Sequence, residues 1–176
     1  MIETLISSKT RIKLLLKFFI NSNTQAYLRS LEDEFKESTN SIRIELNRLE
    51  QANMLKSNLS GNKKIYQANT KHPLFFDIQK IVMKHVGIDE IINNVAKNLG
   101  LLERVYLTGS FVKGNDSKII DLVFIGEIDE AYLDTLIAKS EKLIKRKINV
   151  KVVSIKDFNE TNYIDKQNYL LCWTNS

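Results

Sequence analysis

Two apolar runs joined by a glycine-serine break constrain the second half of this chain, where residues 107–126 read LTGSFVKGNDSKIIDLVFIG. The first run has the composition of a buried strand, and Gly109-Ser110 predicts a sharp turn. One helical turn at residues 111–114 and a polar loop lead to a second predicted strand, which carries a single carboxylate, Asp121. This layout is typical of a nucleotide-handling site that lacks most of its acids.

Strands and one long helix alternate through this second half. Residues 127–147 predict an amphipathic helix, and its expected inward residues include Tyr132, Leu136, Leu143 and Ile144. Strands are predicted at residues 104–108, 119–125, 149–154 and 169–174. With a helical first half, the pattern predicts an α+β fold in which a small α/β domain follows an N-terminal module.

Three predicted helices and a hairpin make up the first half. The helices span residues 8–20, 28–36 and 39–53, with Ser8 and Thr39 as N-caps. Their expected inward residues are Ile12, Leu15, Leu16 and Phe19, then Leu28, Leu31 and Phe35, then Ile42, Leu46 and Leu49. Strands at residues 55–59 and 63–67 flank the turn signal Ser60-Gly61-Asn62, which places Lys63 and Lys64 near phosphates. This order of elements predicts a winged helix-turn-helix.

Charge is unevenly distributed along the chain. Residues 1–85 hold 14 Lys and Arg against 8 Asp and Glu, whereas residues 86–176 hold 12 against 13, giving nets of +6 and −1. The basic half is expected to meet a polyanion. The outer side of the third helix carries side chains that can read base edges in the major groove, although a solvated face is the alternative. These side chains are Asn40, Ser41, Arg43, Asn47, Arg48 and Gln51.

Three stretches of the first half read SSKTRIKLLLKFF, AYLRSLEDEF and STNSIRIELNRLEQANMLKSNLSGNKKIYQANTKHPLF. They resemble the winged-helix domain of ArsR-type bacterial regulators, in particular the subgroup with an N-x-x-H-P-L-F-like segment, here residues 69–75. The resemblance implies a homodimer that binds operator DNA, with the helix from Thr39 as recognition helix and residues 61–64 as wing. That helix contains no Cys or His, so a metal-responsive repressor is not expected.

A helical connector is predicted after Pro73. Its helices span residues 74–86 and 89–99, and one face of the first carries Phe75, Ile78, Ile81, Val82 and His85. His72 and His85 lack an acidic or cysteine partner at ligand spacing and are expected to be structural. The predicted domains are therefore residues 1–72, a connector of residues 73–100, and residues 101–176.

Gly109, Ser110, Gly114 and Asp121 follow the order G-S, helical turn, G, loop, strand acid. This order resembles the minimal nucleotidyltransferases of the DNA-polymerase-β superfamily, whose strand carries S-D-x-D. Here Ile119 holds the first acid position, on the same strand face as Asp121. On the next predicted strand, KINVKVV, the third acid is replaced by a face with Asn149 and Lys151.

One carboxylate of three cannot supply the hard oxygen ligands that two magnesium ions need. Asp116, Glu127 and Asp129 lack the spacing to substitute. We therefore expect a pseudo-nucleotidyltransferase with no catalytic residue, no metal and no cofactor. The Ser110 hydroxyl is expected to cap the short helix, and the alternative is a phosphate or nucleotide site. That site would comprise Gly109, Ser110, Lys113 and Asp121.

The remaining features bound the function. Cys172 is the single cysteine, so it cannot form an intrachain disulfide, and it is expected in the core. No segment approaches the roughly 18 apolar residues of a membrane span. A cytoplasmic location is therefore expected. The leading hypothesis is a homodimeric, sequence-specific DNA-binding transcriptional regulator, whose nucleotidyltransferase-like domain serves dimerisation or ligand sensing. The alternatives are an active nucleotidyltransferase that modifies a protein or small molecule, and an antitoxin-like module that binds a protein partner.

Overall fold

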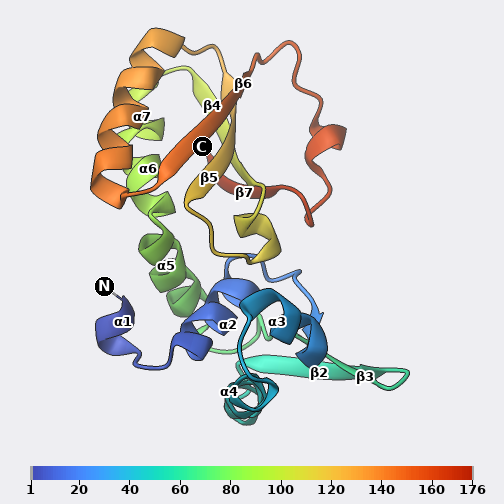
Figure 1. Cartoon of the computed structure of the whole chain (residues 1–176). Coiled ribbons are helices and arrows are strands. Elements are labelled where there is room, and N and C mark those ends of the chain that lie inside the picture. Colours follow the sequence, from blue (N-terminus) through green and yellow to red (C-terminus); the bar gives the residue numbers. More distant parts are fainter. Residues whose placement is uncertain (1, 176) are drawn as a thin grey trace. The chain divides into compact units, whose positions relative to one another are not determined.

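The computed structural model describes residues 2–175 as a mixed α+β chain with two separate β-sheets. The chain divides into two compact units, residues 1–85 and 86–176 (Figure 1). Every helix within the described residues is too short or too polar to cross a lipid bilayer.

Helices and a small antiparallel sheet form the first unit. In chain order the elements are α1 (Ile2–Leu5), α2 (Lys9–Phe19), β1 (Ala26–Tyr27), α3 (Leu28–Phe35), α4 (Thr39–Gln51), β2 (Leu55–Ser60), β3 (Lys63–Ala68) and α5 (Phe75–Val86). β3 lies between β1 and β2, and α2 and α3 both pack against α4. The three predicted helices and the hairpin strands are thus confirmed as elements.

Two details of the predicted caps and turn differ. Ser8 caps α2 as predicted, but α4 is capped by Ser38, whose hydroxyl accepts a hydrogen bond from the Ser41 amide at 3.2 Å. Thr39 is already helical, since the extended backbone needed at a cap falls one residue earlier. Ser60 pairs with Lys63, so the hairpin loop is the two residues 61–62. Gly61 has a φ of 58°, as a type II′ turn requires of its first loop residue.

The predicted inward face of α5 is only partly right. Phe75 and Val82 are buried, and the Phe75 ring stacks on Phe19 at 5.6 Å between centroids. Ile81, however, is 44% exposed. Ile81 lies one position before Val82, and each helical residue turns the side chain by about 100°, so the two side chains point in different directions.

A four-stranded sheet organises the second unit. Its elements are α6 (Ile88–Asn94), the 3-10 turn η1 (Ala96–Asn98), β4 (Leu102–Thr108), η2 (Phe111–Lys113), β5 (Ile119–Gly126), α7 (Glu130–Ile144), β6 (Lys147–Val153), η3 (Glu160–Tyr163) and β7 (Leu170–Thr174). The strand order is β6-β5-β4-β7, with β5 and β6 parallel and the β4 pairs antiparallel. Figure 1 shows α7 and α6 on one side of this sheet.

The long helix of this unit is shorter than predicted and faces the sheet differently. Asp129 caps α7 by accepting from the Tyr132 amide at 3.1 Å, so residues 127–128 are not helical. Leu133, Leu136 and Ser140 point inward, whereas Tyr132 and Leu143 are 45% and 64% exposed. The sequence prediction was wrong for Tyr132 and Leu143 because the buried stripe runs through the small residue Ser140, which carries no apolar signal.

Gly126 allows the end of β5 to contact the backbone that precedes β4. A Cβ atom there would lie 2.4 Å from the Leu101 carbonyl oxygen and 2.9 Å from the Leu102 Cα. We expect Gly126→Ala to lower the free energy of unfolding by about 1–3 kcal/mol, since backbone atoms must move. Thermal unfolding followed by circular dichroism should show a lower Tm. Gly100→Ala is the matched control, because its Cβ would meet nothing within 4 Å, and an unchanged Gly126→Ala variant would contradict the packing described.

Cys172 lies half-buried on the edge strand β7 rather than in the core, with its thiol 3.4 Å from the Leu170 carbonyl oxygen. Burial raises the pKa of the Cys172 thiol to about 12. At pH 8 the native protein should therefore react with a disulfide reagent such as DTNB far more slowly than the guanidinium-unfolded protein, because the thiolate is the nucleophile. Cys172→Ser gives the zero-reaction baseline, and rapid reaction of the native protein would refute the burial.

Candidate functional site

A groove on the first unit lies between α4, the start of α3 and the β2–β3 hairpin. Its volume is about 660 Å³. We call it the α4–hairpin groove, and it is lined by Tyr27, Leu28, Arg29, Glu32, Thr39, Arg43, Asn47, Asn62, Lys63, Lys64 and Tyr66. Four basic side chains and one carboxylate give it an excess of positive charge. It is therefore a basic groove.

Glu50 fixes the hairpin against α4. Its carboxylate accepts hydrogen bonds from the Ser57 hydroxyl on β2 and from Lys64 Nζ on β3, the latter at 2.6 Å. These two hydrogen bonds lower the pKa of Glu50, and the one that Lys64 donates to Glu50 raises the pKa of Lys64. Lys64 therefore serves first to hold the hairpin, and its charge is largely neutralised within the protein.

Lys63 is held differently from Lys64. Its Nζ lies 4.5 Å from the centroid of the Tyr27 ring, a cation–π geometry, while Lys64 lies 5.2 Å from the Tyr66 ring. An aromatic face positions the Lys63 ammonium without cancelling its charge. Of the two predicted wing lysines, Lys63 is the one free to contact an external phosphate.

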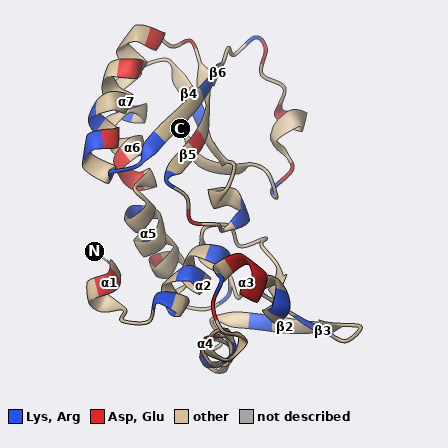
Figure 2. Cartoon of the chain, viewed as in Figure 1, with Lys and Arg blue, Asp and Glu red and all other residues tan. Residues whose placement is uncertain are grey.

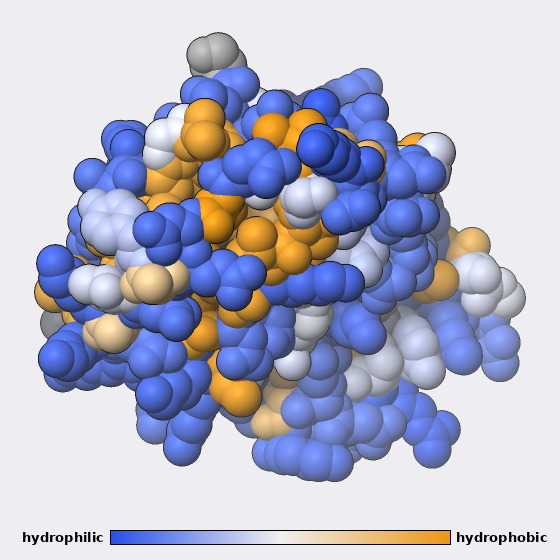
Figure 3. Space-filling model, turned by 90° about the horizontal axis from the view of Figure 1, so that it is seen from above, coloured by the Kyte–Doolittle hydropathy of each residue, from blue (hydrophilic) through white to orange (hydrophobic). Residues whose placement is uncertain are grey.

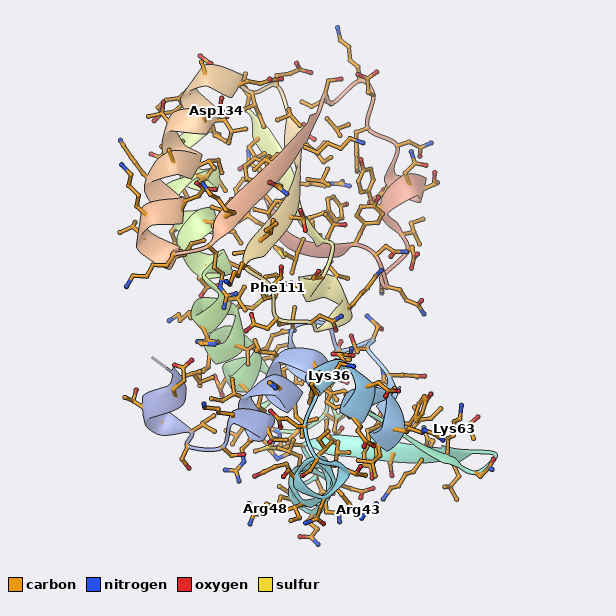
Figure 4. All side chains as sticks on the ribbon, viewed as in Figure 1. Lys36, Arg43, Arg48, Lys63, Phe111 and Asp134 are labelled. Carbon is orange, nitrogen blue, oxygen red and sulfur yellow. The ribbon has the colours of Figure 1, made fainter. Side chains whose placement is uncertain are left out.

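The predicted reading face of α4 is exposed, but the groove collects only part of it. Arg43 and Asn47 line the groove together with Lys63 and Lys64. Figure 4 shows Arg43 and Arg48 projecting from α4 and Lys63 from the hairpin. The side chains of Asn40, Ser41, Arg48 and Gln51 are exposed outside the groove lining.

Two of the side chains outside the groove have internal partners. The Ser41 hydroxyl lies 2.7 Å from the Ser38 hydroxyl at the N-cap of α4. Arg48 Nη1 lies 3.2 Å from Glu45 Oε1. Both residues thus contribute to the geometry of α4, and their predicted contacts with DNA stay predictions.

A buried carboxylate fixes the rotation of α4. Glu45 is 5% exposed, and Arg11 of α2 donates to its two oxygens, from Nε at 2.8 Å and from Nη2 at 3.3 Å. Burial alone would raise the pKa of Glu45, but the hydrogen bonds from Arg11 and Ser8 and the charge of Arg48 lower it. The periodicity of apolar residues gave no sign of this pair, because it treats an acid as a surface residue.

Sequence reasoning also missed groove residues that come from other elements. Tyr27 pairs with Ile65 in the β1–β3 register, which places its ring beside the start of β3. Arg29, Thr39, Asn62 and Tyr66 complete the lining. The available signal was an aromatic residue, Tyr27, two positions before a basic one, Arg29, since this combination is common in nucleic-acid interfaces.

The second candidate site is the face of the second sheet around Asp121. Strand register places Thr108, Asp121 and Asn149 side by side on β4, β5 and β6. Asn149 Nδ2 donates to Asp121 Oδ1 at 3.0 Å. The other oxygen, Oδ2, lies 2.4 Å from where a Gly109 Cβ would be, so only glycine fits under this carboxylate. Asp121 and Gly109 therefore lie in direct contact.

The residues around Asp121 do not fit a catalytic metal pair. Ile119 is 41% exposed at the first acid position, and Asn149 and Lys151 provide a neutral amide and a positive charge on the same face of β6. Asp116 is engaged elsewhere, with Arg146 Nη1 2.8 Å from its carboxylate. Within residues 2–175 no group of three His, Cys, Asp or Glu side chains is placed to hold a metal ion. Magnesium requires more carboxylate oxygen than this face offers.

The Gly109-Ser110 turn uses its polar groups internally. The Ser110 carbonyl accepts from the amides of Lys113 and Asn115, at 3.1 and 3.0 Å, and the Phe111 carbonyl accepts from Gly114 at 2.9 Å. The Ser110 hydroxyl makes no capping bond to η2, contrary to the sequence prediction, because Ser110 is itself in a helical conformation. Lys113 is exposed at the end of this turn. The amides of Lys113, Gly114 and Asn115 are therefore engaged within the turn, and a phosphate site at the amides of residues 109–111 stays a prediction.

Aromatic rings cover the rest of this face. Tyr106, Val123 and Ile125 form a buried cluster, and Phe158, Tyr163 and Tyr169 from the following segment pack on it. Tyr163 stacks on Tyr106 at 5.0 Å and lies 4.9 Å from Tyr169. Burial raises the pKa of Tyr163. The exposed part of the face is therefore limited to the neighbourhood of Asp121, Asn149 and Lys151.

The similarities between this chain and known proteins are weak. No family model and no curated protein matches the chain. Among solved structures, AF1382 from Archaeoglobus fulgidus is 19% identical with a TM-score of 0.39, and the match covers 53% of this chain and 99% of AF1382. A mutant MntA–HpeT toxin–antitoxin complex is 18% identical with a TM-score of 0.39, over 50% of this chain and 72% of the matched one. The tri-AMPylated Shewanella oneidensis HEPN toxin in complex with MNT antitoxin is 18% identical with a TM-score of 0.37, over 53% and 74% of the two chains.

Proposed function

We propose that the first unit is a winged helix-turn-helix that binds duplex DNA in a transcriptional regulator. The observation that carries the proposal is the α4–hairpin groove, which places Arg43 and Asn47 of α4 beside Lys63 of the hairpin. Arg can bond two acceptors of guanine and Asn both groups of an adenine edge, while Lys contacts phosphate. In such a domain the helix is expected to contact the bases and the basic hairpin to contact the phosphates, and this unit offers side chains for both.

A homodimer fits this proposal. One recognition helix contacts only a few base pairs, and paired helices about 34 Å apart read two half-sites one DNA turn from each other.

The second unit, in this proposal, does not transfer nucleotides and instead serves dimerisation or ligand sensing. Asp121 is the one acid at the expected strand position, and its Oδ1 is engaged with a neutral amide. An active nucleotidyltransferase is the alternative for this unit. It would need magnesium and a nucleoside triphosphate to be held with a single carboxylate of the expected three.

A protein-interaction module, such as an antitoxin, is the second candidate function. Exposed apolar side chains on the second unit favour it: Leu143 on α7 is 64% exposed, and Leu171 on the edge strand β7 is 49% exposed. Figure 3 shows hydrophobic side chains at the surface among hydrophilic ones. Co-purification of a stoichiometric protein partner, without DNA binding by the chain alone, would decide for this candidate.

Duplex DNA binding can be tested with three single variants. Arg43→Ala should reduce the preference for the selected sequence by about 1–3 kcal/mol, whereas Lys63→Ala should weaken binding to all sequences alike. Lys64→Ala should act mainly through stability, because Lys64 is paired with Glu50. The measurement is fluorescence anisotropy with DNA selected from a random pool, over a series of salt concentrations.

Lys71→Ala, an exposed lysine outside the groove, is the control for loss of charge alone. If wild type fails to bind any selected duplex at low salt, or if Lys63→Ala and Lys71→Ala weaken binding equally, the groove is not a DNA site.

Metal binding tests the proposed absence of catalysis. Wild type should bind Mn²⁺ no better than Asp121→Asn, whereas Ile119→Asp combined with Asn149→Asp should gain a site by restoring the missing carboxylates. Electron paramagnetic resonance titration of free Mn²⁺ measures both. Transfer of label from a nucleoside triphosphate by wild type, lost in Asp121→Ala, would instead establish an active enzyme.

A further inference from the structure

The second unit contains a basic groove that the proposed function does not use. It has a volume of about 630 Å³ and lies where the end of α7 meets the loop before β5 and the start of β6. We call it the α7–β6 groove, and it is lined by Lys118, Ala138, Glu141, Lys142, Lys145, Arg146 and Lys147. Five of these seven residues are basic. Figure 2 shows basic residues at this end of α7 and along β6.

The acids of the groove are already neutralised within the protein. Glu141 accepts from the Ile148 amide at 2.8 Å and from Lys147 Nζ at 3.0 Å, and both hydrogen bonds lower its pKa. Asp116, just before the groove, is paired with Arg146. Each acid is therefore matched by one cation, and three lysines are left over.

Lys118, Lys142 and Lys145 are the uncompensated cations. All three are exposed, and none forms an ion pair with a carboxylate of residues 2–175. They come from the loop before β5, the last turn of α7 and its C-cap. Separate elements are needed to bring them together, so the cluster is not a single charged run of sequence.

The scaffold beneath these lysines is firmly tied. Lys147 donates its amide to the Lys118 carbonyl at 2.9 Å, and Arg146 donates to the Ser117 carbonyl. The Arg146 guanidinium also lies 5.3 Å from the centroid of the Phe111 ring. The loop before β5 and the turn after α7 are thus held as one surface, on which the three lysine side chains stand.

Helix polarity explains only part of this cluster. Lysines in the last turn stabilise the negative end of a helix, which accounts for Lys142 and Lys145 but not for Lys118. The same negative end disfavours one small anion bound deep against the helix carbonyls. It does not prevent repeated phosphates from crossing the lysine tips, where charge is greatest.

We infer that the α7–β6 groove binds the phosphodiester backbone of nucleic acid without reading its sequence. Lysine ammonium groups contact phosphate as mobile point charges, and Ala138 is the one apolar side chain of the lining, so no pocket for a base is present. The inference extends the proposed function by adding a second nucleic-acid contact, but it does not depend on the α4–hairpin groove.

A charge-matched comparison tests this inference in the full chain. One variant carries Lys118→Ala, Lys142→Ala and Lys145→Ala. Its control carries Lys97→Ala, Lys139→Ala and Lys156→Ala, three exposed lysines of the same unit outside the groove. The groove variant should bind duplex DNA or single-stranded RNA more weakly, and the slope of log affinity against log salt should become shallower by about 3 for duplex DNA or about 2 for RNA. The control should stay close to wild type.

A variant with Arg43→Ala and Lys63→Ala separates the two grooves. If it loses DNA binding while the groove variant matches wild type, the α7–β6 groove is not a nucleic-acid contact and the proposed function stands. If the groove variant alone loses binding, the inference stands and the α4–hairpin groove is not the DNA site. Equal losses in the groove variant and its lysine control, or displacement of nucleic acid by polyglutamate at equal charge concentration, would overturn the inference.

Discussion

The Arg11–Glu45 ion pair is the interaction on which the proposed DNA-reading face depends. The Glu45 carboxylate is buried, so turning α4 about its axis would separate it from the Arg11 donors and destabilise the fold. Arg43 and Asn47 each lie two positions from Glu45, which on a helix means about 200° around the axis. Anchoring Glu45 toward α2 therefore keeps both side chains directed to solvent, where they line the groove with Lys63.

The Asp121 carboxylate lies in a different environment from that of Glu45. It lies on the sheet face rather than in the core, and its partner is the neutral amide of Asn149 rather than a cation. A second carboxylate at position 149 would repel Asp121 unless a metal ion lay between them. With Ile119, Asn149 and Lys151 around it, the single negative charge is stable without a metal. The tight approach to Gly109 is then kept for packing.

The sequence was sufficient for what depends on local period and turn chemistry. Apolar spacing located α2, α3 and α4, and the strands that carry Asp121 and Asn149 were both expected, whereas their parallel pairing is seen only in the structure. The sequence prediction failed where a polar residue is buried or an apolar residue is exposed. In α7, Ser140 is fully buried while Leu143 is exposed. It also failed for the α4–hairpin groove, because Tyr27 reaches Lys63 through a strand pairing of residues far apart in the chain.

Net charge does not describe how the cations are distributed within the second unit. The second half sums to −1, yet eight of its twelve basic residues fall in residues 113–151 around the start of β5 and β6. A charge acts over roughly one Debye length, about 8–10 Å in physiological salt, so distant acids do not cancel this cluster. Acids at the start of α7, such as Asp129 and Glu130, lie a full helix away from Lys145. Polyanion binding is therefore decided by where the fold gathers its cations, and both units gather them where a helix meets the strands.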